Sequence, residues 1–411
     1  MNEMQARKDW AESGALALTG RPDGPPVVPV GDAPLWARRW AAWILDSTPV
    51  GGTPLDGLDG AALLGERAAF TGHTRQGRTS VGGHARLLPT ADGWAALSCA
   101  RPDDVGLLGA MIGSTIDGDP WPLVENWLAT RIDDEVNERT DLLGIAGCCV
   151  RGGEVRPRDV ALSPELPRAA RSVSGAVVVD FSALWAGPLC AHILGAAGAR
   201  VIKVETPTRL DGARLGNKDF YDLLHAGHES VVLDPNRPGE RAALAALVAS
   251  ADIVIESSRP RALARFGLDA HAEAARGCTW VSITADGRSS NRVGFGDDVA
   301  ASAGLVAWEN ETNPLFVGDA IADPLTGLRA AVCALDARNV SAGRVWDVSM
   351  TEVVSSTLAA STLTCSADEN DTADANDAPT AQPPRGRTPV GRAPVSGTHT
   401  AAVLAELGIA L

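Results

Sequence analysis

The sequence is short of positive charge. It has 36 lysines and arginines against 51 aspartates and glutamates, a formal net charge of −15, and no basic cluster that could neutralise a run of phosphates. Proteins that bind nucleic acid need such a cluster, so this balance argues against that class. A polyanionic ligand of any kind would need a local basic pocket.

The sequence also lacks the patterns of secreted, metal-binding and membrane proteins. Its seven cysteines form no C-x-x-C pair and no pairing with histidine at metal-ligand spacing, which favours reduced thiols and no metal site. The first residues, MNEMQARKDWAESG, hold no apolar signal core, and no stretch of about 20 apolar residues occurs anywhere. We therefore expect a cytoplasmic protein without a membrane partner.

What the sequence does hold is an internal repeat. The stretch from Gly318 to Asp336, GDAIADPLTGLRAAVCALD, recurs as residues 31–46, GDAPLWARRWAAWILD. With one gap of three residues, nine of the sixteen remaining positions are identical. The earlier copy lacks the tripeptide that ends in Asp323, so the two copies differ by one acidic residue.

Asp323 precedes Pro324, which is the sequence context of a helix N-cap followed by proline at the first helical position. Two interpretations stay open on this pattern alone. Asp323 is either an ordinary capping residue or a carboxylate that the helix dipole holds deprotonated. A carboxylate held in that way could attack a thioester as a nucleophile.

Composition and periodicity divide the chain into six segments. Residues 49–150 predict a small α+β domain, in which two strands meet at a turn at residues 91–93 and two helices cover about 103–113 and 121–143. The predicted segments are a degenerate copy of the repeat region (1–48), the small domain (49–150), a linker (151–174), a large domain (175–365), a disordered acidic and proline-rich linker (366–393) and a C-terminal helix that docks on the large domain (394–411).

The large domain has the pattern of a doubly wound α/β fold. Short apolar runs at 176–180, 200–205, 230–233, 253–256 and 279–283 alternate with helical stretches, as buried parallel strands do. The turn after the first of these runs lacks the G-x-G-x-x-G of dinucleotide-binding proteins. We therefore expect a Rossmann-like fold without a nicotinamide site.

Several runs in the large domain resemble the family III CoA-transferases, the group of formyl-CoA transferase and carnitine-CoA transferase. They are VVVDFSALWAGPLCAHILGAAGARVIKVE, SVVLDPNRPGER, ADIVIESSRPRALARFGL, the Asp323 element, RVWDVSM and the closing GTHTAAVLAELG. Residues 60–150 resemble the family's small domain, which in ordinary members follows the nucleophile. Their place here implies a permuted or degenerate duplicated order.

The resemblance implies roles for particular residues. Asp323 would attack an acyl-CoA, giving a mixed anhydride and then an enzyme-CoA thioester, while Asp319 would serve only in a turn. CoA contacts would come from Trp185 and Ala186 at the first helix, from Arg265 on CoA phosphate, from Ser257, and from His228, which stands where the family usually has a lysine. Gly82 and Gly83 would lie in a glycine loop that closes over the aspartate.

Three functions remain open. The first is transfer of CoA from an acyl-CoA to a carboxylic acid, with CoA as substrate and no permanently bound cofactor. The second is racemisation of a 2-methylacyl-CoA, whose branch of the superfamily carries Gly-His-Asp where this chain has Gly296, Asp297 and Asp298, so a second base would be needed. The third is a non-catalytic CoA-binding subunit. The resemblance also implies a homodimer, possibly interlocked.

Overall fold

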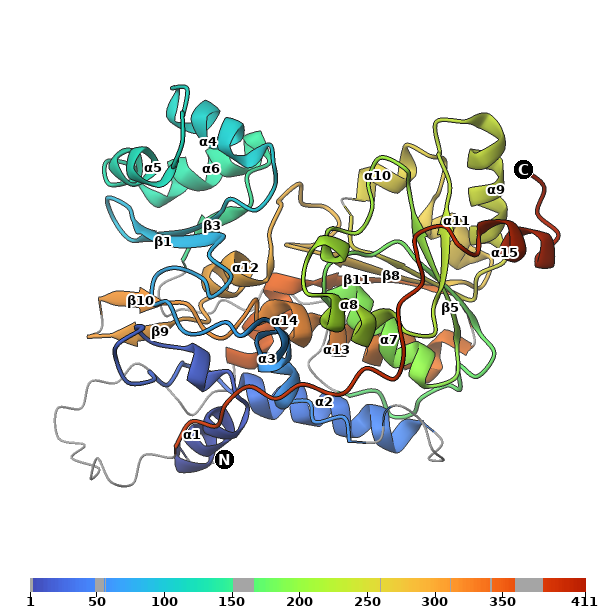
Figure 1. Cartoon of the computed structure of the whole chain (residues 1–411), viewed down its shortest axis with the longest axis horizontal. Coiled ribbons are helices and arrows are strands. Elements are labelled where there is room, and N and C mark those ends of the chain that lie inside the picture. Colours follow the sequence, from blue (N-terminus) through green and yellow to red (C-terminus); the bar gives the residue numbers. More distant parts are fainter. Residues whose placement is uncertain are drawn as a thin grey trace.

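The computed structural model describes residues 3–48, 55, 57–150, 166–258, 260–310, 312–340, 342–358 and 380–411 (Figure 1). Residues 151–165 of the linker predicted at 151–174, and residues 366–379 of the linker predicted at 366–393, lie outside the described residues.

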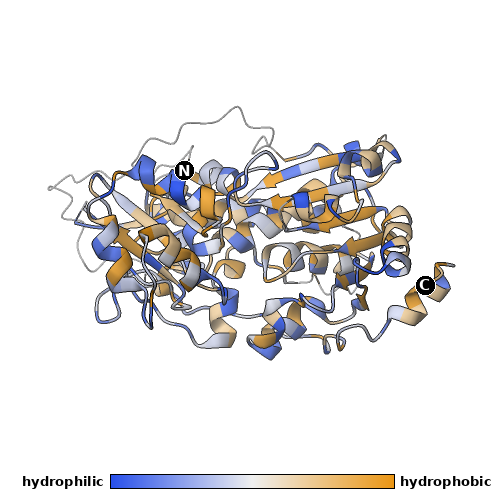
Figure 2. Ribbon diagram, turned by 90° about the horizontal axis from the view of Figure 1, so that it is seen from above, coloured by the Kyte–Doolittle hydropathy of each residue, from blue (hydrophilic) through white to orange (hydrophobic). Residues whose placement is uncertain are grey.

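The large domain is built on a six-stranded sheet in the order β11-β8-β7-β4-β5-β6, and every neighbouring pair is parallel. The strands are β4 (Val177–Asp180), β5 (Arg200–Glu205), β6 (Glu229–Val232), β7 (Ile253–Glu256), β8 (Thr279–Thr284) and β11 (Arg344–Ser349). Most of their valines and isoleucines are buried, on both faces, as in α/β proteins with two helical layers, and Figure 2 shows these strands as largely hydrophobic. The predicted doubly wound α/β fold is confirmed.

Helices cover both faces of this sheet. The face toward the candidate site carries α7 (Ala186–Ala196), α13 (Ala322–Leu335) and α14 (Met350–Leu358), which share one core with α2 (Ala33–Ser47). The other face packs against α9 (Pro238–Ala249), α11 (Ala270–Ala275) and α15 (Thr400–Glu406). The remaining helices of the large domain are α8 (Lys218–His225), α10 (Pro260–Ala264) and α12 (Gly296–Ser302), and a strand pair joins β9 (Ala307–Glu309) to β10 (Asn313–Leu315).

The two repeat copies form two helices that pack against each other. Each helix follows a glycine in the left-handed region, Gly31 at φ 88° and Gly318 at φ 66°. In the later copy the extra tripeptide adds a turn before α13, so Ile321 takes the N-cap position and Asp323 is the second helical residue. The expectation that Asp323 itself is the N-cap is therefore wrong.

The small domain is a three-stranded antiparallel sheet with helices on one side. Its strands are β1 (Ala85–Pro89), β2 (Trp94–Ser98) and β3 (Gly147–Cys149), and its helices are α4 (Asp104–Ile112), α5 (Trp121–Leu128) and α6 (Asp133–Leu143). The hairpin turn lies where the sequence predicts it, since Pro89 pairs with Trp94.

The single helix predicted at 121–143 is wrong, because the chain breaks between α5 and α6. The Thr130 hydroxyl donates to the Trp127 carbonyl at 3.0 Å, which competes with helix continuation. Three acidic residues then occupy the first turn of α6, where the helix dipole favours them. Ile132 is 53% exposed in this break.

Before the small domain, α1 (Glu3–Glu12) packs on α2, and α3 (Glu66–Thr71) leads into the loop before β1. Short 3-10 helices occur at Leu16–Leu18, Ala62–Gly65, Gly212–Leu215 and Ala337–Val340. The small domain contacts the large domain through α12, which packs on β2 and β3. No helix among the described residues is long and apolar enough to cross a membrane.

Residues 380–399, here called the strap, run along the molecule without helix or strand and end in a turn at 396–399 that leads into α15 (Figure 1). The Gln382 amide donates to the Ala11 carbonyl at 2.8 Å, and the Ala393 amide donates to Asp222 at 2.9 Å. Arg387 forms a bidentate ion pair with buried Glu66. The expectation of disorder is wrong for residues 380–393, because polar pairing to buried acids orders a segment that has little apolar surface to bury.

Candidate functional site

The candidate site lies at the carboxyl edge of the sheet, where the strand order reverses between β4 and β7. Ligands of open α/β sheets bind at such a switch point. Ser257 follows β7, and its hydroxyl accepts from the Ala183 amide in the loop after β4 at 3.1 Å. The loop then leads through Trp185 into α7.

Close packing of α13 on α7 sets the position of Asp323. A Cβ on Gly327 would lie 2.7 Å from the Ala186 carbonyl oxygen, so only glycine permits this approach. Asp323, one turn earlier on the same face, then reaches the first turn of α7. The Ala186 amide donates to Asp323 Oδ1 at 3.3 Å.

A second glycine covers the other carboxylate oxygen. A Cβ on Gly296 would lie 2.1 Å from Asp323 Oδ2 and 2.5 Å from the Ala320 carbonyl oxygen. Gly296 begins α12, so the first turn of that helix lies directly against the carboxylate. In the sequence this triplet stands out only as a departure from the racemase pattern, and nothing local reveals the role of its glycine.

Four aspartates gather around this point, and we call Asp297, Asp298, Asp319 and Asp323 the acid cluster. Arg67 of α3 forms a bidentate ion pair with Asp319, with 2.9 Å between Nε and Oδ2. Its guanidinium also lies 5.2 Å from the centroid of the Trp185 ring, a cation–π contact. One cation from the first part of the chain thus lies among the acids of the large domain.

Burial and neighbouring charges shift the pKa values of the acid cluster in opposite directions. Burial alone would raise the pKa of Asp319, yet the Arg67 ion pair lowers it to about 2. Burial raises the pKa of Asp323 to about 6, against the opposing effects of Arg67 and the Ala186 amide. Burial and the neighbouring Asp319 charge raise the pKa of Asp297 to about 7. The pKa of Asp323 is therefore raised, whereas a helix dipole alone would lower it.

Asp319 lies in the turn before α13, as expected, but its side chain also forms a buried ion pair. It is 0% exposed, and its partner Arg67 is 252 residues away in sequence. His73 Nδ1 lies 3.8 Å from Asp319 Oδ2. Neither Arg67 nor His73 stands in a motif that local sequence could reveal, because only the packing of the two parts brings them to the acid cluster.

The structure places the glycine loop near the acid cluster. Gly83 has a φ of 80°, in the left-handed region that favours glycine. A Cβ on Gly82 would lie 3.9 Å from the His73 ring, which itself faces Asp319. Gly82 is therefore linked to the acid cluster through His73.

The predicted CoA-contact residues are not all accessible. Trp185 is 1% exposed and packs edge-on against Phe220, with ring centroids 5.3 Å apart. Its indole is thus a buried part of the wall of the candidate site. The amide of the next residue, Ala186, faces Asp323. Arg265 is exposed after α10, in reach of an external anion.

His228 does not suit a phosphate contact in this structure. Its side chain is buried, and its Nδ1 lies 3.4 Å from Nδ1 of His225. Burial, together with the nearby Lys203 charge, lowers the pKa of His228 to about 3, so the ring is neutral at pH 7. The histidine fills interior space where a charged lysine would have to reach solvent.

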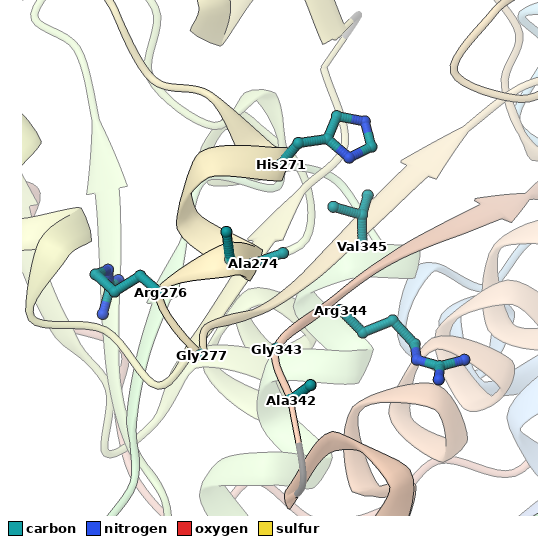
Figure 3. A pocket seen from close by; sticks show the side chains of 9 residues that line it. His271, Ala274, Arg276, Gly277, Ala342, Gly343, Arg344 and Val345 are labelled. Atoms are coloured by element: carbon teal, nitrogen blue, oxygen red, sulfur yellow. The ribbon is translucent and has the colours of Figure 1, made fainter.

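Two grooves of this structure lie away from Asp323. The larger, about 600 Å³, is at the amino edge of β8 and β11, where the Arg276 and Arg344 side chains point to opposite sides (Figure 3). The smaller, about 330 Å³, lies between α10 and the ends of β7 and β8. Within the described ranges, no group of three or more His, Cys, Asp or Glu residues could hold a metal ion.

Comparison with known proteins matches residues 173–388 to the family model described as CoA-transferase family III, which is 216 of the 411 residues. The chain is 29% identical over 220 residues to succinate–glutarate CoA-transferase of Agrobacterium fabrum, covering 47% of this chain and 55% of that protein. It is 33% identical over 105 residues to formyl-CoA:oxalate CoA-transferase of Afipia carboxidovorans, covering 24% of this chain and 25% of that protein.

A solved CAIB/BAIF family protein from Brucella suis is 26% identical, with a TM-score of 0.43, and the match covers 46% of this chain and 56% of that one. The chain spans about half the length, or less, of the curated relatives it matches. The family match begins at residue 173, so the resemblance of residues 60–150 to the family's small domain, and the permuted order, stay predictions. From the matched residues and the parallel sheet they form, the chain belongs to CoA-transferase family III.

Proposed function

We propose that this chain transfers CoA from an acyl-CoA thioester to a carboxylic acid, with Asp323 as the nucleophile. The observation that carries the proposal is the setting of Asp323. Asp323 is half-buried as a residue, and α7, α12 and Arg67 surround its carboxylate. With a pKa of about 6, it is mainly ionised at pH 7 and more basic than an ordinary aspartate.

The proposed chemistry proceeds through two kinds of covalent intermediate. An Asp323 oxygen attacks the thioester carbonyl, and the C–S bond breaks to release CoA thiolate and leave a mixed anhydride. The thiolate then attacks the Asp323 carbonyl, releasing the acyl carboxylate and leaving an enzyme-CoA thioester. An acceptor carboxylate repeats both steps in reverse order, which forms the new acyl-CoA and restores Asp323.

The substrate contacts follow from the geometry of the site. We propose that the pantetheine end reaches Asp323 beside Ala186 and the wall made by Trp185, that Ser257 borders the path, and that Arg265 pairs with phosphate outside it. Gly82 and Gly83 would cover the acyl group. His228 is left out because it is buried and neutral. The homodimer, the absence of a bound cofactor and the cytoplasmic location stay predictions from the sequence.

Trapping the intermediate tests this proposal. The protein is incubated with a panel of acyl-CoA thioesters, treated with hydroxylamine and digested for mass spectrometry, with Asp323→Asn as the matched control. We expect a hydroxamate at Asp323 in the original chain alone. Tight CoA binding without any adduct would instead support the non-catalytic binding subunit.

A second function, racemisation of a 2-methylacyl-CoA, gains one observation. The sequence has no histidine between residues 272 and 398, but Asp297 has a pKa of about 7 and lies beside Gly296, which touches Asp323. Two carboxyl groups titrating near neutrality are suited to proton transfer. Solvent deuterium entering C2 of a branched acyl-CoA, and lost in Asp297→Asn, would favour this function over transfer.

A further inference from the structure

Strained backbone lies on two sides of Asp323. Among the described residues, the non-glycine residues with positive φ are Leu184 at 69°, Asn310 at 54° and Ala320 at 46°. Asparagine is enriched in this left-handed region, whereas leucine and alanine enter it at a cost, because Cβ approaches the following carbonyl oxygen. The Ala320 carbonyl accepts from the Asp323 amide at 2.9 Å. Leu184 lies two residues before Ala186, whose amide donates to the Asp323 carboxylate.

Side chains hold the loop that contains Leu184. This loop leads from β4 to α7, and its three consecutive amides each donate to a side-chain oxygen. The Ser182 amide donates to Asp180 at 2.8 Å, the Ala183 amide to Ser257 at 3.1 Å and the Leu184 amide to Asp211 at 3.0 Å. Asp211 therefore makes the contact at the strained residue itself.

A buried lysine holds Asp211 in turn. Lys203 of β5 is 1% exposed, and its Nζ lies 2.9 Å from Asp211 Oδ2. The same Nζ donates to the Ser182 carbonyl at 2.9 Å. Asp211 is buried as well, and a buried ion pair commits both partners, because removal of one leaves the other charged and away from water. The pair thus binds the loop at the Ser182 carbonyl and at the Leu184 amide.

The loop passes its conformation on to α7 by direct packing. A Cβ on Gly187 would lie 2.1 Å from Ser182 Cβ, so no side chain separates the loop from the first turn of α7. Trp185, the N-cap, has a φ of −133°, outside the helical range. Leu184 and Trp185 therefore make the turn into the helix, and a changed φ at Leu184 would move the Ala186 amide.

We propose that Asp211 is a positioning residue for the reaction at Asp323, and that Lys203 orients it. By accepting from the Leu184 amide, Asp211 keeps Leu184 in the left-handed region, and the chain then enters α7 with the Ala186 amide directed at Asp323. Strain of this kind persists only where the surroundings over-determine it. The kinetic readouts of this inference rest on the proposed function, whereas its stability readout does not.

Asp211 also has a local role that the experiment must separate. It is the N-cap of the 3-10 helix Gly212–Leu215, and its Oδ1 also accepts from the Ala213 amide at 2.9 Å. If capping were its whole role, a substitution at Leu184 would not change the importance of Asp211. The experiment therefore varies Leu184, which is 41% exposed, and leaves the cap intact.

Substitutions at Leu184 test the strain. Glycine and asparagine accept positive φ, whereas β-branched valine resists it. We expect Leu184→Gly and Leu184→Asn to keep kcat within about 3-fold, and Leu184→Val to lower it by about 30-fold. Leu215→Val is the matched control, since this leucine is 94% exposed and has a negative φ, and it should leave kcat unchanged. Equal kcat values for the three Leu184 variants would overturn the proposal.

A double-variant cycle tests Asp211 without any activity. Asp211→Ala should lower the Tm, and by less when Leu184→Gly is also present, because glycine needs no partner to keep a positive φ. Asp211→Asn keeps an oxygen acceptor for the Leu184 amide and should therefore show little coupling to Leu184→Gly. Tm changes of Asp211→Ala and Leu184→Gly that simply add would contradict the proposal. If Asp211→Ala does not fold, the Leu184 series decides.

The pH profile separates positioning from a general loss of structure. The Ala186 amide lowers the pKa of Asp323, so its displacement in Leu184→Val should move the acid limb of kcat/KM to higher pH. Leu184→Gly should leave that limb in place. The charged groups that face Asp323, which are Arg67 and the other three aspartates of the acid cluster, are the same in both variants. A slower Leu184→Val with an unmoved limb would contradict the positioning role.

Failure of this inference and failure of the proposed function give different results. If the original chain forms no adduct at Asp323 and transfers no CoA, the proposed function fails, and the Tm cycle still tests whether Asp211 holds Leu184. If the original chain is active and the Leu184 and Asp211 variants behave as simple structural changes, the positioning role alone fails.

Discussion

At the scale of single residues, the candidate site keeps a carboxylate in surroundings that oppose its charge. Burial raises the pKa of Asp323 to about 6, although a guanidinium and a backbone amide act in the other direction. The raised pKa means that ionised Asp323 destabilises the folded state relative to its protonated form. Stability and reactivity therefore conflict at this residue.

Replacing Asp323 by Asn should separate the effect on stability from the effect on reactivity. The contribution of Asp323 to stability is fully present below its unfolded pKa near 3.8 and is lost as pH rises through about 6. At pH 8 we therefore expect Asp323→Asn to stabilise the fold by roughly 1–2 kcal/mol while transfer falls by about 1000-fold or more. Thermal melts at pH 5 and pH 8 measure the change in stability, and steady-state kinetics measure the change in transfer rate. A loss of stability at pH 8 would contradict the argument.

The rate should depend on the ionisation of the same group. If Asp323 is the nucleophile, as proposed, kcat/KM should fall as pH drops below about 6, because protonation removes its negative charge. A pH profile from 4.5 to 8.5, in buffers of constant ionic strength, measures the midpoint. A midpoint at the ordinary aspartate value would show that the surroundings of Asp323 are not those described.

Gly296 should tolerate no side chain. A Cβ at this position would lie 2.1 Å from Asp323 Oδ2, so Gly296→Ala should displace Asp323 and reduce the proposed transfer by about 100-fold. Gly106→Ala in α4 is the matched control, since nothing lies within 4 Å of its Cβ and alanine favours helix. Kinetics on both variants make the comparison, and equal activity would refute the contact.

At the scale of elements, the strap gives the protein an ordered connection that a composition argument does not anticipate. Its arginines differ in setting. Arg387 is 18% exposed and pairs with Glu66 at 1%, whereas Arg385 is 57% exposed and pairs with Asp59 at 41%. Two arginines that are two residues apart thus form one surface ion pair and one buried ion pair.

Alanine at these two positions should have unequal effects. Arg387→Ala leaves Glu66 buried without its cation and should cost roughly 3 kcal/mol, while Arg385→Ala should cost less than about 1 kcal/mol. Chemical denaturation of both variants measures the difference. Equal costs would mean that the strap does not depend on the buried pair.

The sequence predicts elements well where one local pattern dominates. The buried strands of the sheet and the hairpin ending at Trp94 lie where apolar runs and turn residues place them. The break at Ile132 is not predicted by periodicity, because the Thr130 hydroxyl binds the Trp127 carbonyl there and competes with the helical hydrogen bond. Asp323 stands out because the repeat marks it, whereas Arg67 does not, since its only distinction is a contact 252 residues away.

At the scale of the whole molecule, the small and large domains share buried polar contacts as well as a packed interface. β2 and β3 lie against α12, and Ser98 binds Asp298 within that interface. The strap in addition connects α1, through Ala11, to the large domain, through Asp222. The two domains are therefore coupled in stability.

Calorimetry should show this coupling as a single unfolding transition. Ser98→Ala leaves the buried carboxyl group of Asp298 without its hydroxyl donor and should cost roughly 1–3 kcal/mol. In that variant the transition should broaden or divide as the domains lose their link. Two well-separated transitions in the unaltered protein would contradict the coupling.

Gly327 has a consequence for reading related sequences. Any side chain at that position would push α13 away from α7 and carry Asp323 off the Ala186 amide, although position 327 lies a full helical turn from the carboxylate. A glycine four places after the aspartate is therefore a spacing requirement. Relatives that keep the acid but have a bulkier residue four places on would have to hold that acid by a different geometry.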